Sequence, residues 1–279
     1  MNRRWYSAPY IVWSLIFVVV PLLVVAYYGL TAQSADGSLE FSLENFKRFF
    51  TPLYLGVLWR SALYAAISTV ICLLLGYPAA MILASKDLKH KSVMMFLIVI
   101  PMWMNLLLRT YSWLTLLENQ GLINQFLRFI GVLGKEQSIQ FLYSEGAVIF
   151  GMVYNFLPFM ILPIYSVMSK MDYSIINAAE DLGANKFNVF KKVTFPLSIP
   201  GIYSGITMVF VPAITTFAIS SILSGNNVNL LGNVIEKQFL VGNDWNFGST
   251  MSLVLMIFIL LSLVIMPDSE KESQGGMII

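Results

Sequence analysis

Residues 61–84 read SALYAAISTVICLLLGYPAAMILA, an apolar stretch without a single charged side chain. A helix that crosses a hydrocarbon core of about 30 Å needs about 20 predominantly apolar residues. Because this stretch is apolar on every side, a helix formed by it would have no face suited to water. It therefore predicts a transmembrane helix over residues 61–84.

The same pattern recurs on both sides of this stretch, at residues 9–30, 93–117, 147–167, 201–223 and 248–266. The composition agrees, because 57% of all residues are hydrophobic and only 11% are charged. Soluble domains average about 45–50% apolar and about 25% charged residues. The chain is therefore predicted to be an all-α membrane protein with six transmembrane helices.

Several classes of site and partner are disfavoured by the polar residues. The net charge is +2 and no basic block is present, so a nucleic-acid partner is not expected. With one cysteine, Cys72, an internal disulfide is excluded, and with one histidine, His90, no metal site is expected. Cys72 is interpreted as a packing residue, and His90 as a solvated residue near a membrane face.

The first apolar stretch follows Arg3 and Arg4, so a cleaved signal peptide is the alternative to a membrane anchor. The stretch exceeds the roughly 7–15 apolar residues of a signal peptide. Small residues at Thr31 and Ala32 leave cleavage open. We favour a retained span.

Basic residues give the orientation. With the N-terminus inside, segments 1–8, 85–92, 168–200 and 267–279 are cytoplasmic. They hold ten of the 17 Lys and Arg residues: Arg3, Arg4, Lys86, Lys89, Lys91, Lys170, Lys186, Lys191, Lys192 and Lys271. Short inner loops are enriched in such residues. A multi-pass cell-membrane protein with both termini in the cytoplasm is predicted.

Two features are expected near the outer face. Arg109 stands about 24 Å into the third stretch, at 1.5 Å per residue, where its side chain can reach the interface. Residues 117–146 carry apolar side chains at helical spacing, with polar ones between them. They predict an amphipathic helix on the outer surface or across the end of the bundle.

The longest inner segment, 169–196, has its own helix signals. Asp172 or Ser174 can cap a helix, Gly183 can end it, and Asn185 can cap a second helix before Pro196. Helices are predicted over 174–182 and 185–193. The second helix would carry Phe187, Phe190 and Val193 on one face.

Ala178 and Ala179 make the first of these helices thin, so that another protein could approach its backbone closely. Docking into a groove on a cytoplasmic partner is one interpretation. A hairpin that only connects two spans is the other. The residues alone leave both open.

The segment resembles the EAA loop of the permeases of ABC importers. That pattern is Glu-Ala-Ala, three residues, Gly, nine residues, then Ile-x-Leu-Pro. The matching residues here are Ala178, Ala179, Gly183 and Pro196, at the same spacing. Asn177 replaces the leading Glu, Val193 and Phe195 replace Ile and Leu, and Glu180 offers an acid one turn along.

Other stretches resemble the spermidine/putrescine permeases within that family. They are LGYP at 75–78, IPMWMN at 100–105 with RTY at 109–111, LPFM at 157–160, GNVI at 232–235, QF at 238–239 and DW at 244–245. The similarity runs from about residue 9 into the sixth span, and the last dozen residues show no clear match.

The resemblance implies the six-helix, MetI-like fold of type I importers. Residues 1–54 would form the first span and an outer segment, 55–266 the transmembrane domain, and 267–279 a cytoplasmic tail. It implies a second, similar permease subunit, two copies of a cytoplasmic ATPase and an external substrate-binding protein. ATP and Mg would belong to the ATPase, because this chain has no GxxxxGK[ST] loop. It is not expected to be an enzyme or to bind a cofactor.

The resemblance also implies site residues. Those expected to couple to the ATPase are Asn177, Ala178, Ala179, Glu180, Gly183, Phe187, Phe190 and Pro196. For a polyamine cargo, aromatic and polar side chains could hold the cation. The candidates are Tyr111, Trp113, Tyr154, Asn155 and Phe217, with Glu118, Asp244 and Trp245 near the outer mouth. Packing is the alternative role for each aromatic residue.

Three other functions are weighed. The same type of importer could carry thiamine, iron, sulfate or an amino acid. A stand-alone secondary transporter would favour charges within the spans or paired repeats, which the sequence does not show. A membrane enzyme is the weakest alternative, because no catalytic constellation is evident.

Overall fold

A computed structural model describes residues 8–33, 38–85, 89–134 and 136–265. The chain forms two compact units, residues 1–59 with 231–264, and residues 60–230 with 265–279. The predictions for Arg3, Arg4, Lys86, Lys271 and the 267–279 tail fall outside the described residues. Within these, five helices are long and apolar enough to cross a membrane, or six if one bent helix pair counts as a span.

The first unit contains the first and last predicted spans. Its elements are α1 (Ala8–Ser14), the π-helix η2 (Leu15–Val19), α2 (Val20–Gly29), β1 (Thr31–Gln33), β2 (Leu39–Phe41), α3 (Glu44–Phe49), the start of α4, α13 (Leu231–Leu240) and α14 (Trp245–Ile265). The strands form an antiparallel hairpin.

Helix α2 packs closely on α14 within this unit. A Cβ atom at Gly29 would lie 2.5 Å from Leu253 Cδ1 and 3.2 Å from the backbone of Ser249, so a larger residue would force the helices apart. The Thr250 hydroxyl donates to the Gly29 carbonyl (2.9 Å), and Asn246 Nδ2 donates to the Tyr28 carbonyl (3.1 Å). These bonds satisfy carbonyl groups at the end of α2, which has no further turn to supply donors.

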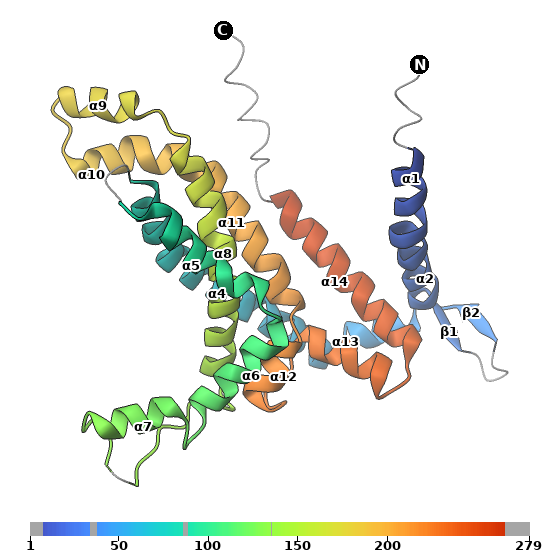
Figure 1. Ribbon diagram of the computed structural model, residues 1–279. Helices are drawn as coiled ribbons and strands as arrows, with labels where there is room; N and C mark the ends of the chain where they lie inside the picture. The colour runs from blue at the N-terminus through green and yellow to red at the C-terminus, as the bar shows by residue number, and fades with distance from the viewer. Residues whose placement is uncertain (1–7, 34–37, 86–88, 135, 266–279) are drawn as a thin grey trace. The chain divides into compact units, whose positions relative to one another are not determined.

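The second unit is built around the long helix α8. It contains most of α4 (Pro52–Ala84), α5 (Lys91–Trp103), α6 (Leu106–Leu117), α7 (Leu122–Phe129), α8 (Glu145–Ser169), α9 (Tyr173–Asp181), α10 (Lys186–Val189), the π-helix η3 (Phe190–Thr194), α11 (Phe195–Thr215) and α12 (Ala218–Ser224) (Figure 1).

Small residues let the helices approach α8. A Cβ atom at Gly201 of α11 would lie 2.9 Å from Ile164 Cα, and one at Gly151 of α8 would lie 2.8 Å from Ile219 Cγ2 of α12. Lipid tails are as apolar as these side chains, so helices associate in membranes mainly through such close packing. The core of this unit therefore lies along α8.

Two of the predicted spans are each broken into two helices. The third divides into α5 and α6, and the α5 axis bends by 97° from the α6–α7 pair. The break follows from local geometry, because Met104 is extended and the Asn105 side chain accepts from Leu107 N (2.8 Å), starting a new helix. The fifth is broken between α11 and α12, where Thr216 is extended.

Two other predictions require correction. The second span begins at Pro52 rather than at residue 61, so α4 includes part of the segment expected to be external. Arg109 is 7% exposed and does not lie at the surface of the unit. Because α6 begins at Leu106, Arg109 lies in the first turn of a new helix, rather than far along a straight span.

Both π-helices precede a proline. Val20 donates to the Leu15 carbonyl just before Pro21, and Phe195 donates to the Phe190 carbonyl just before Pro196. A proline lacks the N–H group of an ordinary helical residue, and its ring clashes with the carbonyl four residues earlier. The wider π turn accommodates the ring without ending the helix. Residues 186–215 therefore form one nearly continuous helix.

Candidate functional site

The inner segment forms the predicted helix, glycine turn and helix. The Asp172 carboxylate accepts from Ser174 N (2.9 Å) at the start of α9. At its end Gly183 has φ of +84°, and the backbone N–H of Ala184 donates to the Ala179 carbonyl (3.1 Å). Left-handed backbone at this position favours glycine. The turn predicted at Gly183 is confirmed.

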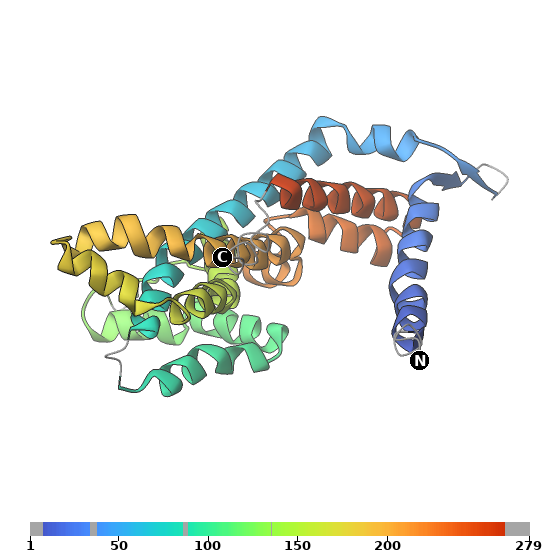
Figure 2. The same cartoon turned by 90° about the horizontal axis from the view of Figure 1, so that it is seen from above.

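The second helix starts as predicted but does not end as a separate element. Asn185 Oδ1 accepts from Asn188 N (2.8 Å) at the start of α10. The helix then continues through η3 and Pro196 into α11. Figures 1 and 2 show α9 and α10 as two arms of one hairpin that projects beyond the ends of α8 and α11.

Side-chain contacts join α4 to α9 and to the helix that continues α10. The Tyr173 hydroxyl donates to the Ala84 carbonyl at the end of α4 (2.8 Å). The Tyr77 hydroxyl lies 3.0 Å from the Ser198 hydroxyl, and the Tyr77 ring contacts the rings of Phe190 and Phe195 at 5.9 and 6.0 Å. Helix α4 is thus joined to α9, η3 and α11.

Large apolar side chains are exposed on the hairpin. Leu182 is 89% exposed, Phe187 68% and Ile175 47%. Asn177 and Ala178 are also exposed, and Phe190 is half-buried. Exposed apolar side chains gathered on a projecting element are typical of a surface that binds another protein. Leu182 and Ile175 were missed in the sequence, although Leu182 directly precedes the helix-ending Gly183.

A cavity of about 460 Å³ lies behind the hairpin. It is lined by residues of α4, α8, α9, α10 and η3, among them Met81, Met168, Ile176, Glu180, Lys186 and Phe190. Glu180 and Lys186 therefore border this cavity. Asn177, which stands where the EAA pattern has its glutamate, is not among the lining residues.

Two of the predicted pathway residues come together in the second unit. The rings of Trp113 (α6) and Tyr154 (α8) meet edge to face at 5.1 Å, and Trp113 meets Phe150 in the same way at 4.7 Å. Phe150 was not predicted; its signal is the one-turn spacing from Tyr154. Tyr111 is 54% exposed and is not part of this contact.

Asn155 lies next to this cluster in sequence but is 1% exposed. Its Nδ2 donates to the Gly151 carbonyl (2.8 Å). Among the described residues, its Oδ1 and the Nε and Nη1 of Arg109 find no hydrogen-bond partner. Such buried polar atoms are unusual and mark places where another molecule could contribute a partner. Phe217 lies at the break between α11 and α12 and is 44% exposed.

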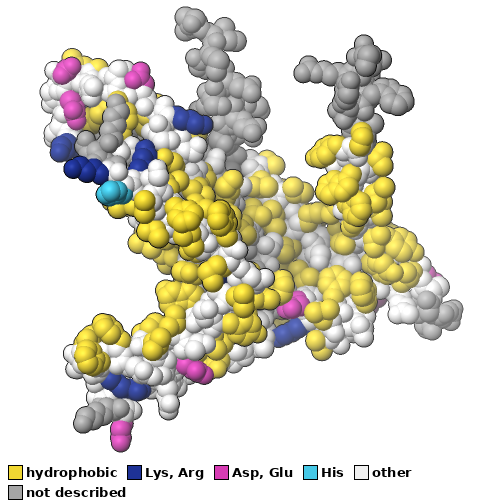
Figure 3. Space-filling model, viewed as in Figure 1, with side chains coloured by type: hydrophobic (Ala, Val, Ile, Leu, Met, Phe, Trp, Pro, Cys, Tyr) yellow, Lys and Arg dark blue, Asp and Glu magenta, His cyan; other side chains and the backbone are white. Residues whose placement is uncertain are grey.

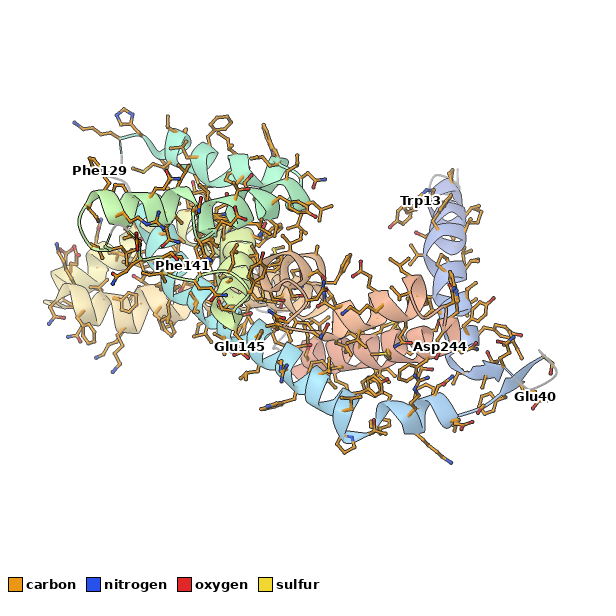
Figure 4. All side chains as sticks on the ribbon, turned by 90° about the horizontal axis from the view of Figure 1, so that it is seen from below. Trp13, Glu40, Phe129, Phe141, Glu145 and Asp244 are labelled. Carbon is orange, nitrogen blue, oxygen red and sulfur yellow. The ribbon has the colours of Figure 1, made fainter. Side chains whose placement is uncertain are left out.

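Of the remaining candidates, Glu118 directly follows α6 in the second unit, and Asp244 and Trp245 belong to the first unit. Asp244 pairs with Arg48 (2.8 Å) and accepts from Phe247 N (3.0 Å), so it caps α14. The Arg48 guanidinium lies 3.9 Å from the centre of the Phe247 ring. Trp245 meets Phe239 at 5.4 Å. Figure 4 labels Asp244 and, in the second unit, Glu145 at the start of α8.

Solved structures share this fold. A bacterial ABC transporter involved in the import of the acidic polysaccharide alginate matches with a TM-score of 0.72, covering 97% of this chain and 94% of that one, at 14% sequence identity. The bacterial alginate ABC transporter in complex with a pentasaccharide-bound periplasmic protein gives 0.74, covering 92% and 90%, also at 14% identity.

Curated relatives are much closer in sequence. The chain is 40% identical to the spermidine/putrescine transport system permease protein PotB of Haemophilus influenzae, over 93% of this chain and 91% of that protein. It is 39% identical to the protein of the same name from Escherichia coli, over 91% and 92%.

The sequence profile of the family described as binding-protein-dependent transport system inner membrane component matches residues 73–267. This match covers most of the chain, both helices of the projecting hairpin included. The family and the apolar helices together identify a multi-pass inner-membrane protein. The chain therefore belongs to the family of binding-protein-dependent transport system inner membrane components.

Proposed function

We propose that this chain is the permease subunit of an ATP-driven importer of spermidine and putrescine. The observation that carries the proposal is the 40% identity to a permease of that name over 93% of the chain. Identity spread over nearly the whole length covers both the pathway helices and the projecting hairpin. It supports a common cargo better than a common fold alone would.

The proposal includes the assembly. A second, similar permease subunit, two copies of a cytoplasmic ATPase and an external substrate-binding protein would complete the importer. ATP and Mg would be bound by the ATPase. Both chain termini and the α9–α10 hairpin would lie in the cytoplasm, in keeping with Lys170, Lys186, Lys191 and Lys192 around it.

The hairpin would work as a stiff coupling element. Leu182, Phe187 and Ile175 offer apolar side chains to a groove on the ATPase. When ATP draws the two ATPase subunits together, the displacement would pass to α4 through Tyr173 and to α11 through the unbroken α10–η3 helix. A nucleotide would thereby shift the pathway between inward-open and outward-open states.

The aromatic cluster is our candidate for contact with cargo inside the membrane. Trp113 and Tyr154 offer ring faces that attract ammonium groups, and Asn155 Oδ1 offers an acceptor. A weak site suffices if the binding protein supplies the affinity. Tyr111, Phe217, Asp244 and Trp245, the other candidates from the sequence, lie outside this cluster, and we assign them no contact with cargo.

Uptake by the complete reconstituted system tests the proposal. Proteoliposomes with all subunits should accumulate labelled spermidine or putrescine only when ATP and the binding protein are both present, and not when this chain is omitted. Accumulation of thiamine, ferric iron, sulfate or an amino acid instead would overturn the cargo. Accumulation by this chain alone would overturn the whole assignment.

A further inference from the structure

Helix α7 carries apolar side chains over a wide arc that its own unit covers only in part. Ile123 and Leu127 are half-buried, and Ile123 lines a cavity of about 480 Å³ with Trp113 and Phe141. Leu122, Phe126 and Phe129 are 64%, 61% and 88% exposed. At 3.6 residues per turn these last three share one face. Half of the apolar arc is therefore open.

The polar side of the same helix is held by hydrogen bonds. Asn124 is fully buried, and its Nδ2 donates to the carbonyls of Glu118 (3.1 Å) and Ile139 (3.0 Å). Arg128 donates to the carbonyls of Gln137 (2.9 Å) and Asn119 (3.1 Å). These bonds fix how the helix is rotated about its axis. Because the rotation of α7 is fixed in this way, Phe126 and Phe129 are held on its exposed side.

This orientation turns the apolar face toward the level of the spans. Figure 1 shows α7 lying across the direction of α8, at the end of α8 opposite to the α9–α10 hairpin. In Figure 3 hydrophobic side chains gather on the side of this arm that faces the hairpin, and basic and acidic side chains gather on its far side. Figure 4 shows Phe129 at the free end of the arm, away from Phe141.

We propose that α7 lies in the outer leaflet interface, with Leu122, Phe126 and Phe129 inserted among lipid acyl chains and Arg128 on the water side. An amphipathic helix with one apolar and one charged face adopts this position when it lies parallel to a bilayer. The open face borders the hollow between α7 and the hairpin that Figure 3 shows, where acyl chains would lie. The placement on the outer side rests on the proposed function.

A bilayer fits this face better than a soluble protein does. A binding protein that approaches from outside meets the charged side of α7, because the apolar side is turned toward the spans. Insertion would also give the α6–α7 segment a fixed depth. Helix α6 lies between α7 and the break at Met104 and Asn105, so α7 would anchor the α6 side of that break in the membrane.

Spin labels at single cysteines in the complete transporter, in nanodiscs of phosphatidylethanolamine and phosphatidylglycerol, test this depth. The native Cys72 is buried and is replaced by alanine. Phe129→Cys and Phe126→Cys are the test positions, and Glu136→Cys in the exposed loop after α7 is the control. Both phenylalanines are exposed, so their replacement removes little internal packing.

Labels at 126 and 129 should collide at least threefold more often with oxygen than with a water-soluble nickel chelate, and the label at 136 should show the reverse. Equal access to the chelate at all three positions would overturn the proposal. So would shielding of 126 and 129 from both reagents, which would indicate a protein on this face.

An impermeant maleimide applied to cells should react with Glu136→Cys. Reaction only from the cytoplasmic side would contradict the orientation in the proposed function, and with it the outer-leaflet placement. The collision rates of the spin labels with oxygen and with the nickel chelate would still report separately whether lipid covers α7.

Discussion

The Tyr173 hydroxyl donates a hydrogen bond of 2.8 Å to the Ala84 carbonyl. Tyr173 begins α9, and Ala84 ends α4, which is a candidate span. The carbonyl at the end of a helix has no partner within that helix, so the tyrosine both satisfies it and joins the hairpin to the span. In the proposed function, this contact is a link through which the ATPase could move α4.

Tyr173→Phe should weaken coupling without preventing assembly. One hydrogen bond of this kind contributes about 1 kcal/mol, which changes the balance between two states about fivefold. We expect the number of polyamines imported per ATP hydrolysed to fall by a similar factor. Tyr10→Phe, at a 70% exposed tyrosine, is the control and should leave the ratio unchanged. An unchanged ratio for Tyr173→Phe would exclude this link.

Gly183→Asp should abolish ATPase binding while membrane insertion survives, and Ala179→Asp should do the same. A charge on this surface would have to be buried against the ATPase without a partner. Gly131→Asp is a matched control, because Gly131 has φ of +80° and, like Gly183, has open space where a Cβ atom would stand. Both glycine variants carry the same backbone strain. Equal copurification of the ATPase with Gly183→Asp and with Gly131→Asp would contradict the account.

Trp113→Phe should raise the KM for polyamine uptake several-fold with little change in thermal stability. Tryptophan attracts cations more strongly than phenylalanine, and a phenyl ring keeps most of the contact with Phe150 and Tyr154. Trp113→Ala should in addition lower the thermal stability, because it removes the ring from its contacts with Phe150 and Tyr154. Tyr111→Ala is expected to keep a normal KM. If only stability changes in Trp113→Phe, the cluster is packing.

Asp244→Asn should leave the KM unchanged. The carboxylate already has two partners, Arg48 and the backbone N–H of Phe247, so a contribution to cargo binding would require breaking them. The ion pair is partly exposed and is expected to contribute at most about 1 kcal/mol, and asparagine can still cap the helix. Uptake at several polyamine concentrations checks this. A tenfold rise in KM would indicate that Asp244 contributes to cargo binding.

The sequence predicted the elements that depend on local signals. The apolar run at 61–84, the capping residues Asp172 and Asn185, and the turn at Gly183 each act within a few residues, and each has its expected role. The predicted limits were less accurate, because composition does not show that α4 begins at Pro52.

The breaks in the third and fifth spans could not be seen in the same way. Residues 93–117 and 201–223 are predominantly apolar, and hydropathy does not distinguish a straight helix from two shorter ones. The break at Asn105 depends on a backbone conformation at Met104 that many residues can adopt. The burial of Arg109 and the contact of Trp113 with Tyr154 follow from that break, so they needed the structure.

Chemical cross-linking at Leu182 tests the central proposal most directly. Leu182→Cys is suitable because Leu182 is 89% exposed and the native Cys72 is buried. In inside-out vesicles of the complete importer we expect this cysteine to cross-link to the ATPase subunit, with a yield that changes when ATP is added. Labelling of the cysteine by an impermeant reagent from outside intact cells, or no cross-link to the ATPase under any nucleotide condition, would contradict the account.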